Sequence, residues 1–140
     1  MEPLFPLHWR ELAVNQHAVK IDLDREKYAN LEKQDMLHVV TVRASFGTNP
    51  NKLVGYAIAF LMPHMHYKSS GPMAMTDMYF VLPEFRRGAG LKMFREYERS
   101  LRAKGILCAI TSCKVHQDHQ AFLEALGWTW TDKTFIKLLQ

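Results

Sequence analysis

The sequence predicts a single α/β domain with a mixed, mostly antiparallel central sheet, one parallel βαβ crossover and flanking helices. Three observations lead to this prediction. Two β-rich segments in the first half are separated by a short turn, as in a hairpin. A strand, an amphipathic helix and an apolar strand then follow one another, as in a right-handed crossover. The length of 140 residues fits one domain, spanning 1–140.

Two helices are expected before the first strand. Residues 8–17 (HWRELAVNQH) place Trp9, Leu12 and Ala13 at helical spacing. Residues 22–36 begin with acidic side chains of the kind that cap a helix N-terminus. The second segment is the more polar, so we expect that helix to lie on the surface.

The hairpin follows directly. Residues 37–44 (LHVVTVRA) and 52–62 (KLVGYAIAFLM) are rich in β-branched and aromatic side chains. The segment 46–51 (FGTNPN) between them has the composition of a turn. We therefore expect two neighbouring antiparallel strands.

The parallel unit comes next, after a loop over 63–72. Residues 74–82 read as a strand, and 91–104 as an amphipathic helix that Gly105 ends. Residues 106–115 are apolar at successive positions, as in a central parallel strand buried on both faces. These segments together predict the crossover.

The last part of the chain predicts a short helix and a return to the sheet. Residues 119–127 read as a helix that ends at Gly127, and 128–139 as one or two strands. The expected order of elements is therefore α-α-β-β-β-α-β-α-β.

Composition and charge exclude several classes of protein. The chain is 48% hydrophobic and 23% charged, with a net charge of +4, so it suits a globular protein with an anionic small ligand. The excess positive charge is too diffuse to indicate nucleic-acid binding. The N-terminus lacks the pattern of a secretory signal, and the apolar run at 53–62 is too short to span a bilayer. We expect a cytoplasmic protein that does not bind membranes.

The two cysteines are Cys108 and Cys113. An odd separation on a strand points them to opposite faces, so they cannot pair locally. We expect free, buried thiols in a reducing compartment.

The stretch VLPEFRRGAGLKMF (81–94) passes from a strand through a small basic loop into a helix. The first N–H groups of a helix have no internal partner, and the helix dipole adds positive potential there. Glycines let the backbone approach a ligand, and arginines add charge. The segment therefore suits a phosphate or diphosphate. A tight turn of small residues with solvated arginines is the alternative.

Two common phosphate-binding patterns do not fit this loop. A P-loop needs lysine and then serine or threonine after its last glycine, but Leu91 and Lys92 follow Gly90. A dinucleotide fingerprint needs a third glycine three residues after Gly90, whereas the next glycine is Gly105.

The segments PEFRRGAG (83–90) and AFLEALGW (121–128) resemble two motifs of the GCN5-related N-acetyltransferases, the GNAT family. The order of helices and strands is similar over nearly the whole chain. Within the family the sequence is most similar to members encoded by tailed bacteriophages and prophages. That likeness depends on PHMHYKS, TDMYFVLPEFRRG and the H-x-D at 116–118.

The sequence departs from the family pattern at two places. The glycine motif is not in strict register, because a one-residue shift is needed to align either Gly88 and Gly90 or Arg87 with it. In addition, the tyrosine that often serves the family as general acid corresponds to Leu123 here.

The resemblance implies that acetyl-coenzyme A (acetyl-CoA) is the cofactor. Its diphosphate would bind the loop 86–92, with Phe80, Val81 and Leu82 along its pantetheine arm in a splay between the two parallel strands. A backbone amide near Phe80 or Val81 would polarise the thioester. The residues of the diphosphate loop are Arg86, Arg87, Gly88, Ala89, Gly90, Leu91 and Lys92.

The resemblance also implies direct acetyl transfer to an amine in a ternary complex. Asp77, the acid of an otherwise apolar strand, is the expected general base; a structural aspartate is the alternative. Tyr79 shares its strand parity, so we expect both on one face, where Tyr79 binds substrate or donates a proton. Packing under a helix is the alternative for Tyr79.

Histidines form a second group of candidates. His64 and His66 precede the Asp77 strand and could contact the acceptor, whereas His116 could act as base, acid or pantetheine contact, with His119 three residues on. Surface or hydrogen-bonded histidines are the alternative. No acid or cysteine accompanies them at ligand spacing, so no metal site is expected.

Three functions therefore compete at this point. The first is an acetyl-CoA-dependent N-acetyltransferase acting on a small-molecule or protein amine. The second is a catalytically weak or inactive module that binds CoA or a host protein. The third, a nucleic-acid-binding domain, is disfavoured because the aromatic residues lie in apolar strands. A homodimer is expected from the resemblance, as is a host protein as acceptor in a host cytoplasm if the chain is phage-encoded.

Overall fold

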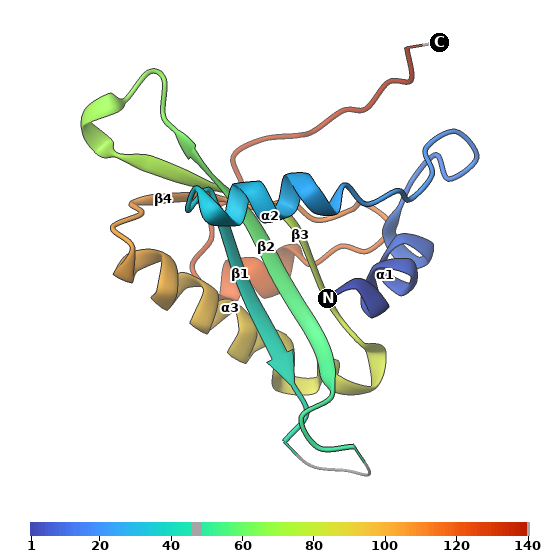
Figure 1. Ribbon diagram of the computed structural model, residues 1–140. Coiled ribbons are helices and arrows are strands. Elements are labelled where there is room, and N and C mark those ends of the chain that lie inside the picture. The colour runs from blue at the N-terminus through green and yellow to red at the C-terminus, as the bar shows by residue number, and fades with distance from the viewer. Residues whose placement is uncertain (46–48, 140) are drawn as a thin grey trace.

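The computed structural model describes residues 1–45 and 49–139. A sheet with strand order β1-β2-β3-β4 forms its centre (Figure 1). The pairs β1–β2 and β2–β3 are antiparallel, whereas β3–β4 is parallel. The strands are β1 (Leu37–Arg43), β2 (Leu53–Pro63), β3 (Pro72–Val81) and β4 (Cys108–Ile110). The predicted mixed sheet with a hairpin and a parallel crossover is confirmed.

In the described residues, four α-helices flank the sheet, and three single turns of 3-10 helix accompany them. The α-helices are α1 (Phe5–Leu12), α2 (Arg25–Lys33), α3 (Arg86–Ala103) and α4 (Gln120–Ala125). The 3-10 turns are η1 (Glu2–Leu4), η2 (Lys68–Ser70) and η3 (Pro83–Phe85). Asp24 caps α2 as the sequence suggests, because its side chain accepts a hydrogen bond from the Lys27 amide.

The sheet separates two hydrophobic clusters. On one face, α3 and α4 contribute Met93, Phe94, Tyr97, Leu101 and Leu123 to the core. On the other face, η1 and α1 bury Leu4 and Phe5, and α2 packs Tyr28 and Leu31 at the margin. In Figure 1 the α2 ribbon crosses in front of the sheet, α1 lies to its right, and α3 lies behind it.

A β-bulge interrupts β3 at Asp77. Ile58 of β2 pairs with Met78 and Ala59 pairs with Thr76, which leaves Asp77 as the extra residue. Side chains beyond the bulge therefore change faces. Asp77 contacts Tyr28 of α2, whereas Tyr79 packs in the cluster of α3. The expectation that Asp77 and Tyr79 share a face is wrong, because parity holds only in an uninterrupted strand.

Two expected strands are shorter or missing. Only Cys108–Ile110 of the segment 106–115 forms a strand, and it lies at the sheet edge rather than in the centre. Residues 128–139 form no strand among the described residues. The expected burial of both cysteines is also wrong, since Cys108 is exposed and Cys113 is half-buried, although both are free thiols. The turn expected at 46–51 falls partly on 46–48, outside the described residues.

Helix α3 begins earlier than the expected 91–104 and carries a kink in its first turn. Arg87 and Gly88 have non-helical backbone angles, and the φ of Gly88 is +86°. Gly105, with a φ of +75°, ends the helix as predicted. No helix in the described part of the chain has the length and apolar character needed to cross a membrane.

Candidate active site

The parallel ladder between β3 and β4 stops early. It pairs Met73 with Cys108, Ala74 with Ala109 and Met75 with Ile110, and then ends. Strand β3 continues to Val81 with only β2 beside it in the described chain. The two parallel strands therefore splay apart, as the family resemblance implies.

A pocket of about 80 Å³ lies where the strands separate. Helix α1, the bulged half of β3 and the loop that follows β4 all contribute to its walls. Its ionisable lining residues are His8, Asp77, Tyr79, Cys113, Lys114 and His119. Elements distant in the sequence thus place six titratable groups around one small space.

Asp77 enters this pocket from the bulge. The Tyr28 hydroxyl donates a hydrogen bond to Asp77 Oδ2 over 3.4 Å. Asp77 as a whole residue is exposed, but neighbouring atoms partly shield its carboxyl from water, and this desolvation raises its pKa. The hydrogen bond from Tyr28 acts in the opposite direction and lowers the pKa. Burial also raises the pKa of Tyr28 to about 12, so the hydroxyl keeps its proton at neutral pH.

Tyr79 and His119 form a second polar pair on the other face of the sheet. The Tyr79 hydroxyl lies 3.3 Å from His119 Nδ1. The Tyr79 ring packs edge-on against Phe94, with 5.1 Å between centroids. Burial raises the pKa of Tyr79 above its ordinary value, so the phenol stays protonated.

His8 is a pocket residue that no sequence pattern indicated. Its Nδ1 lies 2.6 Å from the Tyr56 hydroxyl, and its ring stacks on Phe80 with 5.2 Å between centroids. Burial lowers the pKa of His8 to about 4, and Lys114 acts in the same direction against the opposing effect of Glu11. His8 is therefore a neutral imidazole at pH 7. A helical surface histidine has no sequence signature that distinguishes it from a solvated one.

The backbone of β3 leaves polar groups at the open edge. The Leu82 amide donates to Val54 O over 2.8 Å, so it points toward β2. Backbone groups alternate along a strand, so the amides of Val81 and Tyr79 point outward. The Val81 carbonyl already accepts a hydrogen bond from Arg86 Nε over 2.9 Å. Among Phe80, Val81 and Leu82, Val81 is therefore best placed to offer a free amide.

The glycine loop lies directly beyond this edge. Gly88 has nothing within 4 Å of the position that a Cβ would take, and the corresponding position at Gly90 lies 4.0 Å from Phe122 Cζ. Arg87 and Lys92 are exposed. The helical backbone resumes after Gly88, so the positive end of the α3 dipole lies at this loop. The loop has the open space and the positive charge that an anionic group requires.

Arg86 occupies a different place from the other loop residues. Its Nη2 donates to both carboxylate oxygens of Glu11 over 2.7 Å, and its guanidinium lies over the Phe80 ring at 5.6 Å. With the bond to the Val81 carbonyl, these contacts tie α1, β3 and the loop together. Arg86 thus stabilises the site, and its charge is already paired with Glu11 rather than available to a ligand.

The other predicted histidines lie apart from the pocket. His116 is exposed and does not line it. His64 and His66 flank Tyr67 at the tip of the β2–β3 hairpin, with centroid separations of 4.5 and 6.5 Å. Figure 1 shows this hairpin projecting beyond the rest of the sheet. Of the predicted catalytic residues, the structure therefore brings Asp77 and Tyr79 together with His8 and His119.

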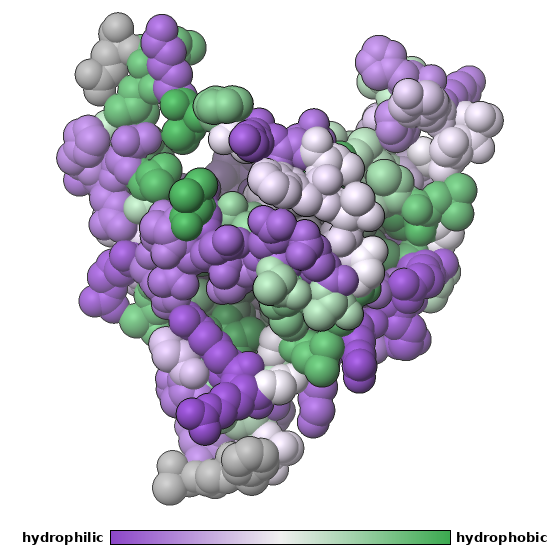
Figure 2. All heavy atoms as spheres, turned by 180° about the vertical axis from the view of Figure 1, so that it is seen from behind, coloured by the Kyte–Doolittle hydropathy of each residue, from purple (hydrophilic) through white to green (hydrophobic). Residues whose placement is uncertain are grey.

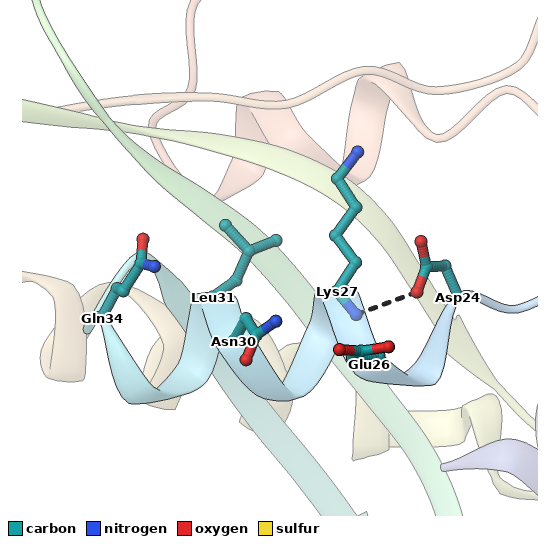
Figure 3. A pocket seen from close by; sticks show the side chains of 6 residues that line it. All are labelled: Asp24, Glu26, Lys27, Asn30, Leu31 and Gln34. Carbon is teal, nitrogen blue, oxygen red and sulfur yellow. Dashed lines mark hydrogen bonds between the residues drawn. The ribbon is translucent and has the colours of Figure 1, made fainter.

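A second hollow lies along α2 and has a different character. Figure 3 shows its six lining side chains, which all come from α2 and the residues bounding it. Asp24 and Lys27 are already joined through the cap of this helix. The hollow is lined by one element alone, so it offers no convergence of catalytic groups from several parts of the fold.

Metal ligands do not gather in the described part of the chain. No group of three or more His, Cys, Asp or Glu side chains there is arranged to hold a metal ion.

Comparison with known proteins decides the family. The model of the Acetyltransferase (GNAT) family matches residues 1–128. The chain belongs to the GNAT family. It is therefore an acetyltransferase of the acetyl-CoA-dependent class, and the cofactor implied by the sequence resemblance is that of its family.

Solved GNAT structures share the fold at low sequence identity. Glucosamine-6-phosphate N-acetyltransferase from Arabidopsis thaliana is 14% identical with a TM-score of 0.73, over 99% of this chain and 91% of that chain. The aminoglycoside N-acetyltransferase AAC(6')-Iy in complex with CoA is 23% identical with a TM-score of 0.61, over 100% and 96%. A ribosomal-protein-alanine N-acetyltransferase from Brucella melitensis is 13% identical with a TM-score of 0.67, over 98% and 89%. No curated protein matches the sequence significantly.

Proposed function

We propose that this GNAT protein transfers an acetyl group from acetyl-CoA to a primary amine by direct attack in a ternary complex. The observation that carries the proposal is the position of the pocket. It opens where β3 loses its parallel partner, and it contains Asp77 on the bulge. The glycine loop at the start of α3 follows at the end of the same strand.

The residues present fit the cofactor. Arg87, Lys92 and the amides after Gly88 would hold the diphosphate, and the outward amide of Val81 would meet the pantetheine arm or the thioester oxygen. Phe80 and Leu82 contribute packing, since both side chains are buried. When bound, acetyl-CoA supplies an acetyl group activated as a thioester.

Asp77 is the proposed general base. A carboxylate with a raised pKa accepts a proton more readily, and Asp77 reaches the pocket beside the outward edge of β3. It would take the proton that the amine loses on acetylation. Tyr28 holds the carboxyl in place from α2.

Tyr79 and His119 are the proposed proton donors on the opposite wall. Tyr79 keeps its proton at neutral pH, and His119 lies within reach of its oxygen. The pair can return a proton to the sulfur that leaves, a role for which the family tyrosine is missing. His116 in this role, and His64 and His66 as acceptor contacts, stay predictions.

The acceptor amine could belong to any of several chemical classes. The similar structures are named for three kinds of acceptor, namely an aminoglycoside, glucosamine-6-phosphate and an alanine of a ribosomal protein. These relatives give no support to a phage origin, so a host-protein acceptor stays a prediction.

A second candidate is a CoA-binding module with weak or no turnover. Leu123 occupies the position of the family tyrosine and is buried at 8% exposure, so it contributes packing rather than chemistry. In that case the pocket would hold the cofactor without completing proton transfer.

Calorimetry with CoA and a thiol-release assay over a panel of amines separate the two functions. The enzyme should bind CoA and release free thiol with at least one amine class from acetyl-CoA. Binding without thiol release across sugars, aminoglycosides, polyamines and peptide N-termini would favour the module. An absence of binding heat would contradict both.

A further inference from the structure

The loop after β4 brings a cation to the pocket that the proposed acetyl transfer does not use. Lys114 lines the pocket together with Ser112 and Gln117 of the same loop. In the described residues, the Lys114 ammonium forms no ion pair with a carboxylate. The segment 111–117 (TSCKVHQ) contains no acidic residue. This wall of the pocket therefore offers one positive charge, a hydroxyl and an amide to a bound molecule.

The acidic side chains close to this wall are held by other groups. Asp118 follows the loop and does not line the pocket, and its Oδ1 accepts a hydrogen bond from the Gln120 amide over 2.8 Å. Glu11 of α1 is paired with Arg86. Among the described residues, Asp77 is thus the one carboxylate in the pocket lining, and it comes from β3.

The positive charge of Lys114 acts on the interior of the pocket, although the residue itself is exposed. Burial lowers the pKa of His8 to about 4, and Lys114 acts in the same direction. The His8 ring is neutral at pH 7, so it adds no charge beside Asp77. One wall of the pocket therefore carries a carboxylate, and the wall formed by the loop carries a cation.

The pocket is small, with a volume of about 80 Å³. Sites for drug-sized ligands measure roughly 300–1,000 Å³. Only a small acceptor, or the end of a larger one, fits there beside a thioester. A nitrogen held by Asp77 and a group held by Lys114 then lie within a few atoms of one another in the same molecule.

The surroundings of the pocket are polar as well. Tyr79 lies on the α3 face of the sheet, which Figure 2 shows from outside. Hydrophilic side chains are spread over that view, with hydrophobic ones in smaller groups between them. This surface suits a polar acceptor rather than one with a long hydrocarbon chain.

We propose that the acceptor is an amine with an anionic group, a carboxylate or a phosphate, a few atoms from its nitrogen, and that Lys114 binds this group. The inference rests on the proposed acetyl transfer and names the substrate class for it. Asp77 faces the amine from β3, whereas the anion meets Lys114, Ser112 and Gln117 on the loop. Polyamines and aminoglycosides carry further positive charges, which Lys114 repels.

Two pairs of amines test the proposal, because the members of each pair differ in the anion. Glycine is compared with glycinamide, and 2-aminoethyl phosphate with ethanolamine, by thiol release from acetyl-CoA. The ratio of kcat/KM between the two members of a pair is measured for the unaltered protein and for Lys114→Gln. Comparing this ratio between proteins cancels the different basicities of the amines. The two pairs also distinguish a carboxylate site from a phosphate site.

Lys114→Gln should lower the ratio of the anionic to the neutral amine by about tenfold, mainly through KM, because one charge-assisted contact is lost. Lys114→Arg keeps the positive charge and should keep the ratio. Lys52→Gln removes a charge from an exposed residue outside the pocket and should leave the ratio unchanged.

Binding to the CoA-loaded protein gives a readout that does not depend on turnover. Titration followed by nuclear magnetic resonance should show weaker binding of glycine or 2-aminoethyl phosphate to Lys114→Gln, by a similar factor. The affinity for CoA, measured by calorimetry, should be the same in both proteins. A fall in CoA affinity instead would mean that Lys114 contacts the cofactor, and it would overturn the proposal.

Two further results would overturn it. The first is an unchanged ratio in Lys114→Gln while CoA binds and amines release thiol, in which case the enzyme stands without this substrate class. The second is thiol release with spermidine or ethanolamine but with neither anionic amine. Binding of the anionic amines without thiol release would retain the Lys114 site and contradict the proposed acetyl transfer. An absence of CoA binding would contradict the proposed function and the substrate class together.

Discussion

The two halves of β3 have the same neighbour on one side and different surroundings on the other. Residues 73–75 are paired by β2 and β4, and Ala74 is fully buried there. Residues 76–81 are paired by β2 alone and contain the bulge. Every ionisable residue that β3 contributes to the pocket comes from this second half. A site thus forms where a sheet loses a ladder, because only there do backbone amides and side chains remain open to a ligand.

Residues 76–81 of β3 lack the backbone hydrogen bonds that a parallel neighbour would supply, so other contacts must stabilise them. Arg86 bonds to the Val81 carbonyl and to Glu11, which links the end of β3 to α1. His8 covers Phe80 and bonds to Tyr56. Side-chain contacts therefore stabilise the half of the strand that has lost a partner.

Replacing Asp77 by asparagine should produce the largest change in activity. The variant keeps the shape of the side chain and loses the base, so kcat should fall by about 10²- to 10⁴-fold with CoA affinity unchanged. Steady-state kinetics and calorimetry measure the two quantities. Asp22→Asn, on an exposed residue outside the pocket, should behave like the unaltered enzyme.

Tyr28→Phe refines this test. It removes the hydrogen bond that lowers the pKa of Asp77, so the acidic limb of the pH profile of kcat/KM should move to higher pH. A fall in kcat for Asp77→Asn without any shift of the limb in Tyr28→Phe would assign the titration to another group.

The second prediction concerns pH and His8. The pKa of His8 is about 4 in the folded protein against an ordinary 6.5, so the unfolded chain takes up the proton first as pH falls. The contribution of the neutral His8 ring to the free energy of unfolding is fully present above pH 6.5. It is lost progressively as the pH falls from 6.5 to about 4. The loss amounts to at most about 3 kcal/mol of unfolding free energy.

Denaturant unfolding of the unaltered protein and His8→Asn between pH 7 and 4 measures this difference. The gap in stability between them should narrow steadily as pH falls. His17→Asn, at an exposed residue, should follow the unaltered protein at every pH. A constant gap for His8→Asn would mean that its ring is not neutral in the fold.

The third prediction tests the boundary between the two halves. Thr76 Oγ1 and the Tyr97 hydroxyl lie 2.8 Å apart, and both residues are buried. Tyr97→Phe leaves the threonine hydroxyl without this partner and should cost about 1–3 kcal/mol of unfolding free energy. Tyr97→Phe/Thr76→Val removes both polar groups and should recover most of that loss. Urea unfolding would show the pair to be unimportant if both variants matched the unaltered protein.

The sequence predicted the paired half of the sheet better than the open half. Local patterns identified the hairpin, β3, the long helix and its end at Gly105, because each leaves a periodic or glycine signal. The bulge at Asp77 left none, since an inserted residue does not change the composition of a strand. The expected parity of Asp77 and Tyr79 was wrong for that reason.

The candidate site was predictable to the extent that it depended on one stretch of chain. Asp77, Tyr79 and the loop around Gly88 lie on successive elements, so the local residue pattern together with the family resemblance could indicate them. His8 and His119 reach the pocket from α1 and from the loop preceding α4, which only tertiary packing brings beside β3. The segments 106–115 and 128–139 have strand composition, but composition does not supply the neighbour that a strand needs.

The smallest effect is expected from substitutions at the two ends of α3. One end of the helix lies beside the open half of β3, and the other end precedes β4, which pairs with the first half of β3. Gly88 lies at the kink in the first turn of α3, at the open end, and Gly105 follows the helix at the paired end, with φ of +86° and +75°. At both positions a Cβ meets nothing within 4 Å, so alanine introduces backbone strain without a clash. Gly88→Ala and Gly105→Ala should each cost about 1 kcal/mol of unfolding free energy. Only Gly88→Ala should also weaken CoA binding, by roughly fivefold to tenfold as the amides turn from their positions. Calorimetry on both variants measures this, and equal CoA affinities would place the diphosphate away from the loop after Gly88.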